Sequence, residues 1–296
     1  PTPKANYENK SYLFTIIGDS ISCGYGNSFQ DIYWSRLERK YKLDKSNEEK
    51  LNFLALCASG DNLYDGLEKL RKFSRENKDI NHKYILYQFN YNDVNPYVRE
   101  EIKKIALEGE IYKGFEGIRM KYLHRSTFIK ALTMNSKRFI SKSNKECSAR
   151  GLNAMGQYTW AFGHPGFKEE SNREWEQFSK VLKSIHEFSI SNNAEFIIFI
   201  SPLLFDVDKN EYHRFFNKNN YDFSCSTISP LRKLIDISDT NKIRLINPTT
   251  YLKKRFEERI EEKNFQPFYF PGDENHFNAI AGEHISDFLY FSIFSK

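Results

Sequence analysis

Short apolar segments that alternate with amphipathic stretches constrain the fold of this chain more than any other feature. Three of the segments are near-continuous runs of Ile, Leu and Phe, as expected for strands covered on both faces. The predicted strands are residues 12–17, 51–56, 83–88, 195–200 and 243–246. Apolar residues at three- and four-residue spacing predict helices at 31–40, 63–73, 174–189, 228–237, 249–262 and 279–294. This alternation predicts a three-layer α/β/α sandwich with a five-stranded parallel sheet and right-handed crossovers.

The interval 96–171 breaks the alternation, because it is too long for a simple crossover and shows no strand pattern. It holds helical patterns at 97–108 and 118–140, followed by the run GLNAMGQYTWAFGHPGF. We interpret it as a mostly helical insertion into a single domain that spans residues 1–296. Sites in open α/β sheets lie beyond the carboxyl ends of the strands, so the insertion is expected to overhang the site. Its tail either lines a substrate pocket or forms a small core of its own, with the aromatic residues Tyr158, Trp160 and Phe162.

Composition and charge exclude several classes of protein. Hydrophobic residues make up 40% of the chain and aromatic residues 16%, which is typical of a folded globular protein. The 44 basic residues exceed the 39 acidic residues by a net charge of +5. This excess is spread along the chain without a basic run, so no nucleic-acid partner is expected. The sequence predicts no membrane span, because it lacks an apolar run of about 18 residues.

The chain begins at Pro1 with the polar stretch PTPKANYENK. Because no initiator Met is present, we interpret residues 1–10 as the remnant of a linker from which a signal peptide or an N-terminal anchor was removed. This favours a periplasmic, secreted or membrane-anchored protein, and a cytoplasmic protein is the remaining alternative.

The four cysteines are widely spaced and form no C-x-x-C pair, which argues against a zinc ribbon or a redox motif. Cys23 and Cys57 lie near the ends of two predicted strands, where they could be neighbours. We nevertheless expect all four to be small buried apolar side chains and not a disulfide framework. No His, Asp or Glu cluster has the spacing of metal ligands, so neither a metal nor another cofactor is expected. The other two cysteines are Cys147 and Cys225, and the carboxylates interpreted as caps and loop ties are Asp61, Asp65 and Asp93.

A candidate nucleophile follows the first predicted strand. Ser20 lies in a Gly-Asp-Ser turn, where the Asp19 side chain can hold the loop through backbone amides. Taken alone, this triplet indicates only a turn. Serine chemistry also needs a histidine to accept the hydroxyl proton, a group that orients the histidine, and donors for the oxyanion.

A candidate histidine lies near the C-terminus, in the segment PGDENHFN. At a spacing of three residues, the Asp273 carboxylate can reach Nδ1 of His276 and leave Nε2 free to face a serine. The alternative is that Asp273 caps the turn and His276 is incidental. Among the other histidines, His82 and His186 are expected at the surface, and His284 on a solvated helix face.

Two further strand ends supply candidate oxyanion donors. The second strand ends in LCASGDN, where the Gly60 amide can approach a ligand closely because no side chain blocks it. The third ends in YQFNYND, where the side-chain amide of Asn92 can donate to the same point. Each residue alone is also a common loop residue. Together with the Asp–His pair, Ser, Gly and Asn at three successive strand ends indicate nucleophilic catalysis.

Four segments resemble the characteristic blocks of the SGNH or GDSL-type hydrolases, a family of esterases and lipases. The segments are GDSISCGYG at 18–26, ASGDNLYDGL at 58–67, NYND at 90–93 and DENH at 273–276, in the order of the family. The resemblance implies a flavodoxin-like fold, with Ser20 as nucleophile and His276 as general base and acid. It also implies that Asp273 orients His276. The implied oxyanion hole consists of the Ser20 amide, the Gly60 amide and the Asn92 side chain.

Asn90 departs from the resemblance, because the third block of the family usually reads Gly-x-Asn-Asp. Asn tolerates left-handed backbone angles better than other non-glycine residues. Asn90 and Asp19, which lie in the third and first of these blocks, are further candidates for the substrate-binding surface.

The resemblance implies hydrolysis of a carboxylic ester through an acyl-enzyme on Ser20. The expected substrate carries a short acyl or O-acetyl group and is a small molecule, a glycan or a lipid. Two alternatives stay open. One is an O-acyltransferase that uses the same residues to modify a cell-surface polysaccharide, and the other is a non-catalytic binding module.

Overall fold

The five predicted strands are all present, and they form one parallel sheet in the order β2-β1-β3-β4-β5. In this computed structural model the described residues are 12–44, 50–94, 158–163, 168–208, 226–261 and 266–295. Each strand begins and ends within two residues of its predicted bounds. The strands are β1 (Tyr12–Gly18), β2 (Leu51–Cys57), β3 (Asn81–Phe89), β4 (Glu195–Ile200) and β5 (Arg244–Ile246).

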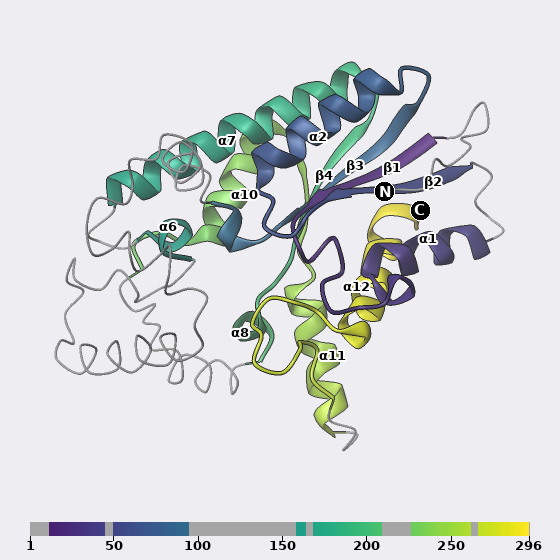
Figure 1. Ribbon diagram of the computed structural model, residues 1–296. Helices are drawn as coiled ribbons and strands as arrows, with labels where there is room; N and C mark the ends of the chain where they lie inside the picture. Colours follow the sequence, from purple (N-terminus) through teal and green to yellow (C-terminus); the bar gives the residue numbers. More distant parts are fainter. Residues whose placement is uncertain are drawn as a thin grey trace, which may run out of the picture.

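Helices cover both faces of the sheet (Figure 1). One face packs against α1 (Tyr33–Leu43), α11 (Thr249–Glu261) and α12 (Ala279–Phe294). The other packs against α2 (Leu63–Glu76), α7 (Lys168–Ser191) and α10 (Pro230–Asn241). The short elements are η1 (Phe29–Asp31), η2 (Tyr91–Asp93), α6 (Thr159–Phe162) and α8 (Leu204–Val207). The predicted α/β/α sandwich is therefore confirmed for the described residues.

Side-chain alternation along β1 explains why the sequence of this strand is almost entirely apolar, with Thr15 as the buried polar exception. Phe14 and Ile16 point into the core beneath α1 and α12, whereas Ile17 points into the core beneath α2 and α7. Successive side chains of a strand face opposite sides of a sheet, so a strand covered on both faces has no polar side. The same reasoning applies to β4, which contributes residues to both cores.

Most of the predicted insertion at 96–171 lies outside the described residues, including the helical patterns at 97–108 and 118–140. The described end of the insertion forms α6, and residues 168–171 belong to the start of α7. Residues 1–11, Cys147 and Cys225 also lie outside the described part of the chain. Within that part, no helix has both the length and the apolar character needed to cross a bilayer.

The prediction that all four cysteines are isolated apolar side chains is wrong for Cys23 and Cys57, which form a disulfide. Their Cα atoms are 5.6 Å apart, within the usual range for a bridged pair. The sheet register places Cys57 beside Gly18, and the turn after β1 brings Cys23 back to the same edge. The cause is thus tertiary, because 34 residues separate the two cysteines in sequence.

The predicted surface position of His82 is also wrong, because this side chain is only 3% exposed. Its Nδ1 lies 2.8 Å from the hydroxyl of Thr15 on β1, and its Nε2 lies 3.0 Å from the hydroxyl of Ser74 on α2. Burial lowers the pKa of His82 to about 4. The reason for the error is that β3 begins at Asn81, two residues before its predicted start, so the polar stretch is strand and not turn.

Two other histidines that are expected to contact solvent are partly buried. The ring of His186 on α7 lies 6.4 Å from that of Phe196, and the ring of His284 on α12 lies 5.3 Å from that of Phe268. Burial lowers the pKa of His284, and the positive charge of Arg255 adds to this effect. Helix positions that look solvated in the sequence therefore face neighbouring elements.

Candidate active site

The turn after β1 holds Ser20 in place through its own backbone. The Asp19 carboxylate accepts the amide of Ile21 at 2.9 Å, and the Asp19 carbonyl accepts the amide of Cys23 at 3.0 Å. The Ser20 carbonyl accepts the amide of Tyr25 at 2.9 Å. The Asp19 side chain is buried, so it serves this turn and does not line an open surface.

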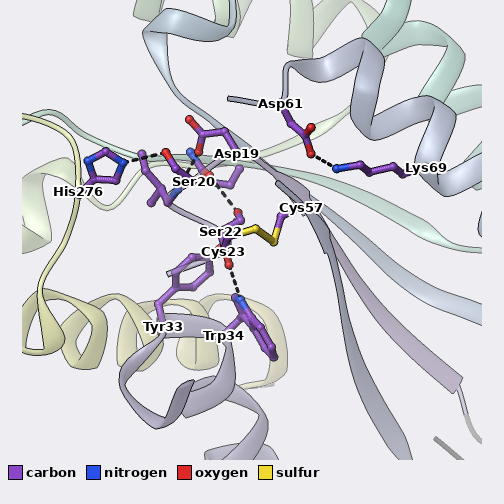
Figure 2. The surroundings of a disulfide bond; sticks show 12 residues. Asp19, Ser20, Ser22, Cys23, Tyr33, Trp34, Cys57, Asp61, Lys69 and His276 are labelled. Carbon is purple, nitrogen blue, oxygen red and sulfur yellow. Dashed lines mark hydrogen bonds and ion pairs between the residues drawn. A yellow bond between two sulfur atoms is a disulfide. The ribbon is translucent and has the colours of Figure 1, made fainter. Parts of the chain in front are cut away.

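A buried polar network supports the turn from behind. Ser22 donates its hydroxyl to Gln88 at 2.9 Å, so the Tyr33 hydroxyl, 3.0 Å away, is the donor to Ser22. The indole of Trp34 donates to the Ser22 carbonyl at 2.6 Å, and Figure 2 shows Trp34 and Tyr33 beneath the turn. A Cβ on Gly18 would lie 2.4 Å from the Ser22 hydroxyl, so only glycine fits there. The turn is therefore fastened to both β3 and α1.

His276 lies opposite Ser20, on the loop that precedes α12 (Figure 2). The Ser20 hydroxyl is 2.8 Å from Nε2 of His276, and Nδ1 is 2.7 Å from Oδ2 of Asp273. The other oxygen of Asp273 accepts the amides of Asn275 and His276, each at 3.0 Å. Because a carboxylate can only accept, Nδ1 carries the proton and Nε2 is free to accept the proton of Ser20. The structure thus brings the three predicted residues into one hydrogen-bonded chain.

The two titratable groups of this chain have shifted pKa values. Burial lowers the pKa of His276, but the hydrogen bond and charge of Asp273, with the charges of Asp19 and Glu274, outweigh burial and raise it above its usual value. Burial raises the pKa of Asp273, but hydrogen bonds from the His276 ring and from the amides of Asn275 and His276 lower it on balance. Asp273 is therefore ionised beside an imidazole that readily takes up a proton.

The loop of residues 266–278, here called the histidine loop, is anchored to several neighbouring elements. The amide of Leu204, at the start of α8, donates to the Glu274 carbonyl at 2.8 Å. The Asn27 side chain donates to the Phe277 carbonyl at 2.7 Å and joins the loop to the turn after β1. Asn278 then caps α12 by accepting the amides of Ile280 and Ala281. These contacts fix His276 although it is far from Ser20 in sequence.

Tyr25 is a residue of the site that the sequence analysis does not single out. Its ring lies 4.7 Å from that of His276, yet 60% of the residue is exposed. Gly24 and Gly26, on either side of it, have φ angles of 71° and 78°. A Cβ on Gly26 would lie 2.9 Å from the Phe270 ring of the histidine loop. The signal in the sequence is the tripeptide Gly-Tyr-Gly, which lets an aromatic ring turn back over the strand end.

Gly60 and Asn92 follow β2 and β3, the two strands that flank β1 in the sheet. Gly60 is exposed in a turn closed by the Asp61 amide on the Ala58 carbonyl, and its φ of 80° requires glycine. Asn92 is half-buried in η2. Because the strands are parallel, both residues lie at the same edge of the sheet as Ser20.

The turn that carries Asn92 shows what Asn90 does in place of glycine. Asn90 has an extended backbone, with φ −123° and ψ 153°, so no left-handed angle is needed there. Its side chain is buried and accepts the Asn92 amide at 3.3 Å. Asp93 accepts the Asn90 amide at 2.7 Å and the Tyr87 hydroxyl at 2.8 Å. Asn90 thus shapes the turn from inside the protein.

The predicted caps and loop ties are observed at all three carboxylates. Asp93 ties the turn of Asn92, and Asp65 forms a capping box with Asn62 at the start of α2. Asp61 forms an ion pair with Lys69, which Figure 2 shows. Within the described residues, no group of three or more His, Cys, Asp or Glu could hold a metal ion.

The aromatic tail of the insertion packs beside the site. Tyr158 is fully buried in the core beneath α2 and α7, and its hydroxyl donates to Glu274 at 3.3 Å. The ring of Phe162 lies 5.4 Å from that of Tyr91 in the turn of Asn92. Trp160 is partly buried. Tyr158 therefore links the main core to the histidine loop and does not form a separate core with its neighbours.

A small hollow with room for about one water molecule opens beside His276. Ile21, Tyr25, Tyr33 and Phe277 contribute the apolar part of its wall. Ser20, Gly60 and Asn92 are not part of its wall, so the hollow lies on the α1 and α12 side of His276 and not over the proposed oxyanion donors.

Solved structures similar to this chain include TesA, the acetyl xylan esterase AlAXEase, and a member of the lipolytic protein G-D-S-L family from Veillonella parvula. Their sequence identities to this chain are 12%, 12% and 10%, with TM-scores of 0.49, 0.49 and 0.46. The alignments cover 95%, 95% and 97% of this chain and 98%, 100% and 99% of the other chains. No family model and no curated protein matches the chain. At identities this low, the chemistry of the chain has to follow from its own residues.

Proposed function

We propose that this protein is a serine hydrolase of carboxylic esters. The observation that carries the proposal is the chain of two short hydrogen bonds from Ser20 through His276 to Asp273. In this mechanism the Ser20 hydroxyl attacks the ester carbonyl while Nε2 of His276 takes its proton. The imidazolium, stabilised by the Asp273 carboxylate, passes the proton to the leaving alcohol. A water molecule, whose proton is taken by His276, then attacks the acyl-enzyme. Ser20 leaves with the proton from His276, and the acid is released.

The oxyanion that forms in both steps needs hydrogen-bond donors at the edge of the sheet where Ser20 lies. We assign this role to the amides of Ser20 and Gly60 and to the side chain of Asn92. The sheet order supports the assignment, because β2 and β3 place Gly60 and Asn92 on opposite sides of the strand that carries Ser20. The exposed, left-handed Gly60 leaves its amide open to a ligand.

The substrate we propose carries a short acyl group such as acetyl, on a small molecule, a glycan or a lipid. The support is the resemblance of the segments at 18–26, 58–67, 90–93 and 273–276 to the blocks of a family of esterases and lipases. A series of nitrophenyl esters with acyl chains of two to about twelve carbons tests this. Turnover that rises with chain length would contradict the short-acyl assignment.

We further propose that the protein works in the periplasm or outside the cell. The disulfide between Cys23 and Cys57 supports this, because such bonds persist in oxidising compartments and are rare in the cytosol. Cell fractionation with an antibody to the chain tests the proposal. Recovery with cytosolic markers would contradict it.

The decisive experiment replaces the nucleophile. We expect Ser20→Ala to abolish hydrolysis of a short-chain nitrophenyl ester and labelling by an organophosphonate, because the Ser20 hydroxyl is the group paired with Nε2 of His276. Ser191→Ala, at the exposed end of α7, is the matched control and should keep both activities. Full activity in Ser20→Ala would refute the assignment. Absence of labelling in the parent protein would instead indicate a binding module.

A further inference from the structure

The Cys23–Cys57 disulfide joins the two segments that carry the backbone amides of the proposed oxyanion hole (Figure 2). Cys23 lies three residues after Ser20, in the turn that follows β1. Cys57 is the last residue of β2, paired with Gly18, and Gly60 lies three residues beyond it. The bond therefore connects the turn of Ser20 to the strand end from which the turn of Gly60 begins.

Of the two donors outside the nucleophile turn, Gly60 is the one with less support from the sheet. It follows β2, which is the edge strand of the described sheet and pairs with β1 alone. Asn92 follows β3, which is paired on both sides. A strand end held by one ladder opens more easily than one held by two. The disulfide lies at the less supported of the two strand ends.

The ion pair and hydrogen bonds of these two turns join each turn to a different element, and not to the other turn. The ion pair between Asp61 and Lys69 ties the turn of Gly60 to α2, as does the Asn62 cap. The hydrogen bonds of Ser22 tie the turn of Ser20 to Gln88 and to α1. These contacts hold each turn against a helix or β3, whereas the disulfide holds the two turns to each other.

We propose that this disulfide is a positioning element of the oxyanion hole, which sets the separation of the Ser20 and Gly60 amides. The proposal rests on the proposed esterase function. Both cysteines are partly exposed, so a small dithiol can reach the bond. Reduction transfers two electrons and two protons from the dithiol, which leaves two thiols and a cyclic disulfide of the reagent. In the reduced protein the Gly60 amide moves more freely relative to the developing oxyanion.

The expected effect is on turnover more than on binding. Removal of one oxyanion donor costs roughly 100- to 1,000-fold in kcat, and a donor that is present but less well held costs less. We expect kcat to fall by about tenfold and KM to stay within about twofold, because a donor that acts in the transition state contributes little to ground-state binding.

The experiment compares three forms of the full chain with a short-chain nitrophenyl ester. They are the parent protein, Cys23→Ala/Cys57→Ala, and the matched control Cys147→Ser/Cys225→Ser. Each is assayed before and after dithiothreitol treatment and again after reoxidation, with alkylation and mass spectrometry to count thiols. We expect reversible loss of kcat in the parent and the control. The Cys23/Cys57 variant should start at the low kcat and not respond to the reagent.

Circular dichroism and the rate of organophosphonate labelling are recorded on the same samples. A reduced protein with its native spectrum, slower labelling and lower kcat supports positioning. The proposal is overturned if cleavage of the bond leaves kcat unchanged, or if activity is lost only in samples that have also lost the native spectrum. It is also overturned if the Cys23/Cys57 variant responds like the parent. These outcomes differ from failure of the esterase function, which would appear as full activity in Ser20→Ala.

Discussion

His82 makes the stability of this protein depend on pH in a direction that follows from its burial. Its pKa is about 4 in the folded protein, against about 6.5 for an unperturbed histidine. Above that unperturbed value both states hold neutral imidazole, and His82 adds no pH dependence. As the pH falls below it, the unfolded chain binds a proton that the folded protein accepts only near the lower pKa. The free energy of unfolding therefore decreases over this interval.

The size of the effect follows from the two pKa values. A shift of about 2.5 units corresponds to about 3 kcal/mol once the pH is below both values, and to about 2 kcal/mol near pH 5. The substitution His82→Gln removes this dependence while keeping a donor and an acceptor for Thr15 and Ser74. We expect the variant to be less stable than the parent at neutral pH, by roughly 1 kcal/mol, because its hydrogen bonds fit less well.

Urea unfolding at about pH 7.5 and about pH 5 measures the effect. The parent should lose about 2 kcal/mol more than His82→Gln between the two conditions. His186→Gln, at a partly buried position on α7, is the control for the replacement of a partly buried histidine by glutamine. Equal losses in the parent and in His82→Gln would refute the reasoning.

Three further predictions concern the site, and a fourth concerns stability. Asn92→Ala should lower kcat by roughly 100- to 1,000-fold with little change in KM, measured by steady-state hydrolysis of a nitrophenyl ester, and unchanged kcat would exclude it as an oxyanion donor. The kcat/KM of the parent should fall with decreasing pH through a pKa above the usual histidine value, because Asp273 raises the pKa of His276. An apparent pKa below the usual histidine value would contradict this. The substitution Asp273→Asn should lower kcat by roughly 10⁴-fold. Cys23→Ala/Cys57→Ala should lower the free energy of unfolding by about 4 kcal/mol, from the 34-residue separation, as measured with urea; no change would contradict the loop-entropy estimate.

Strand and helix positions follow from local sequence, because an element that is buried on one or both faces has a characteristic spacing of apolar residues. The bounds of β4 and α12 are as predicted, since in each case the apolar pattern ends where the element ends. His82 shows the limit of this reasoning. It is a polar residue inside a strand, and only its partners Thr15 and Ser74, on two other elements, make burial tolerable.

Candidate site residues can be located in a sequence when each lies at a strand end or in a loop with a distinctive local pattern. Ser20, Gly60 and Asn92 meet this condition, because parallel strands bring their carboxyl ends to one edge. Tyr25 and Asn90 show what such patterns leave out. The contact of Tyr25 with His276 depends on a loop distant in sequence, and the turn formed by Asn90 depends on Asp93 and its bond to Tyr87.

The sequence by itself determined the order of strands and helices, the residues at each strand end, and the Asp273–His276 spacing, because these depend on neighbours along the chain. The tertiary structure alone decided the distance from Ser20 to His276, the pairing of Cys23 with Cys57 and the burial of His82. The physical reason is that hydrogen bonds, disulfides and desolvation depend on distances in space. Those distances are set only when β1 and β2 pair in register and the helices pack on the sheet.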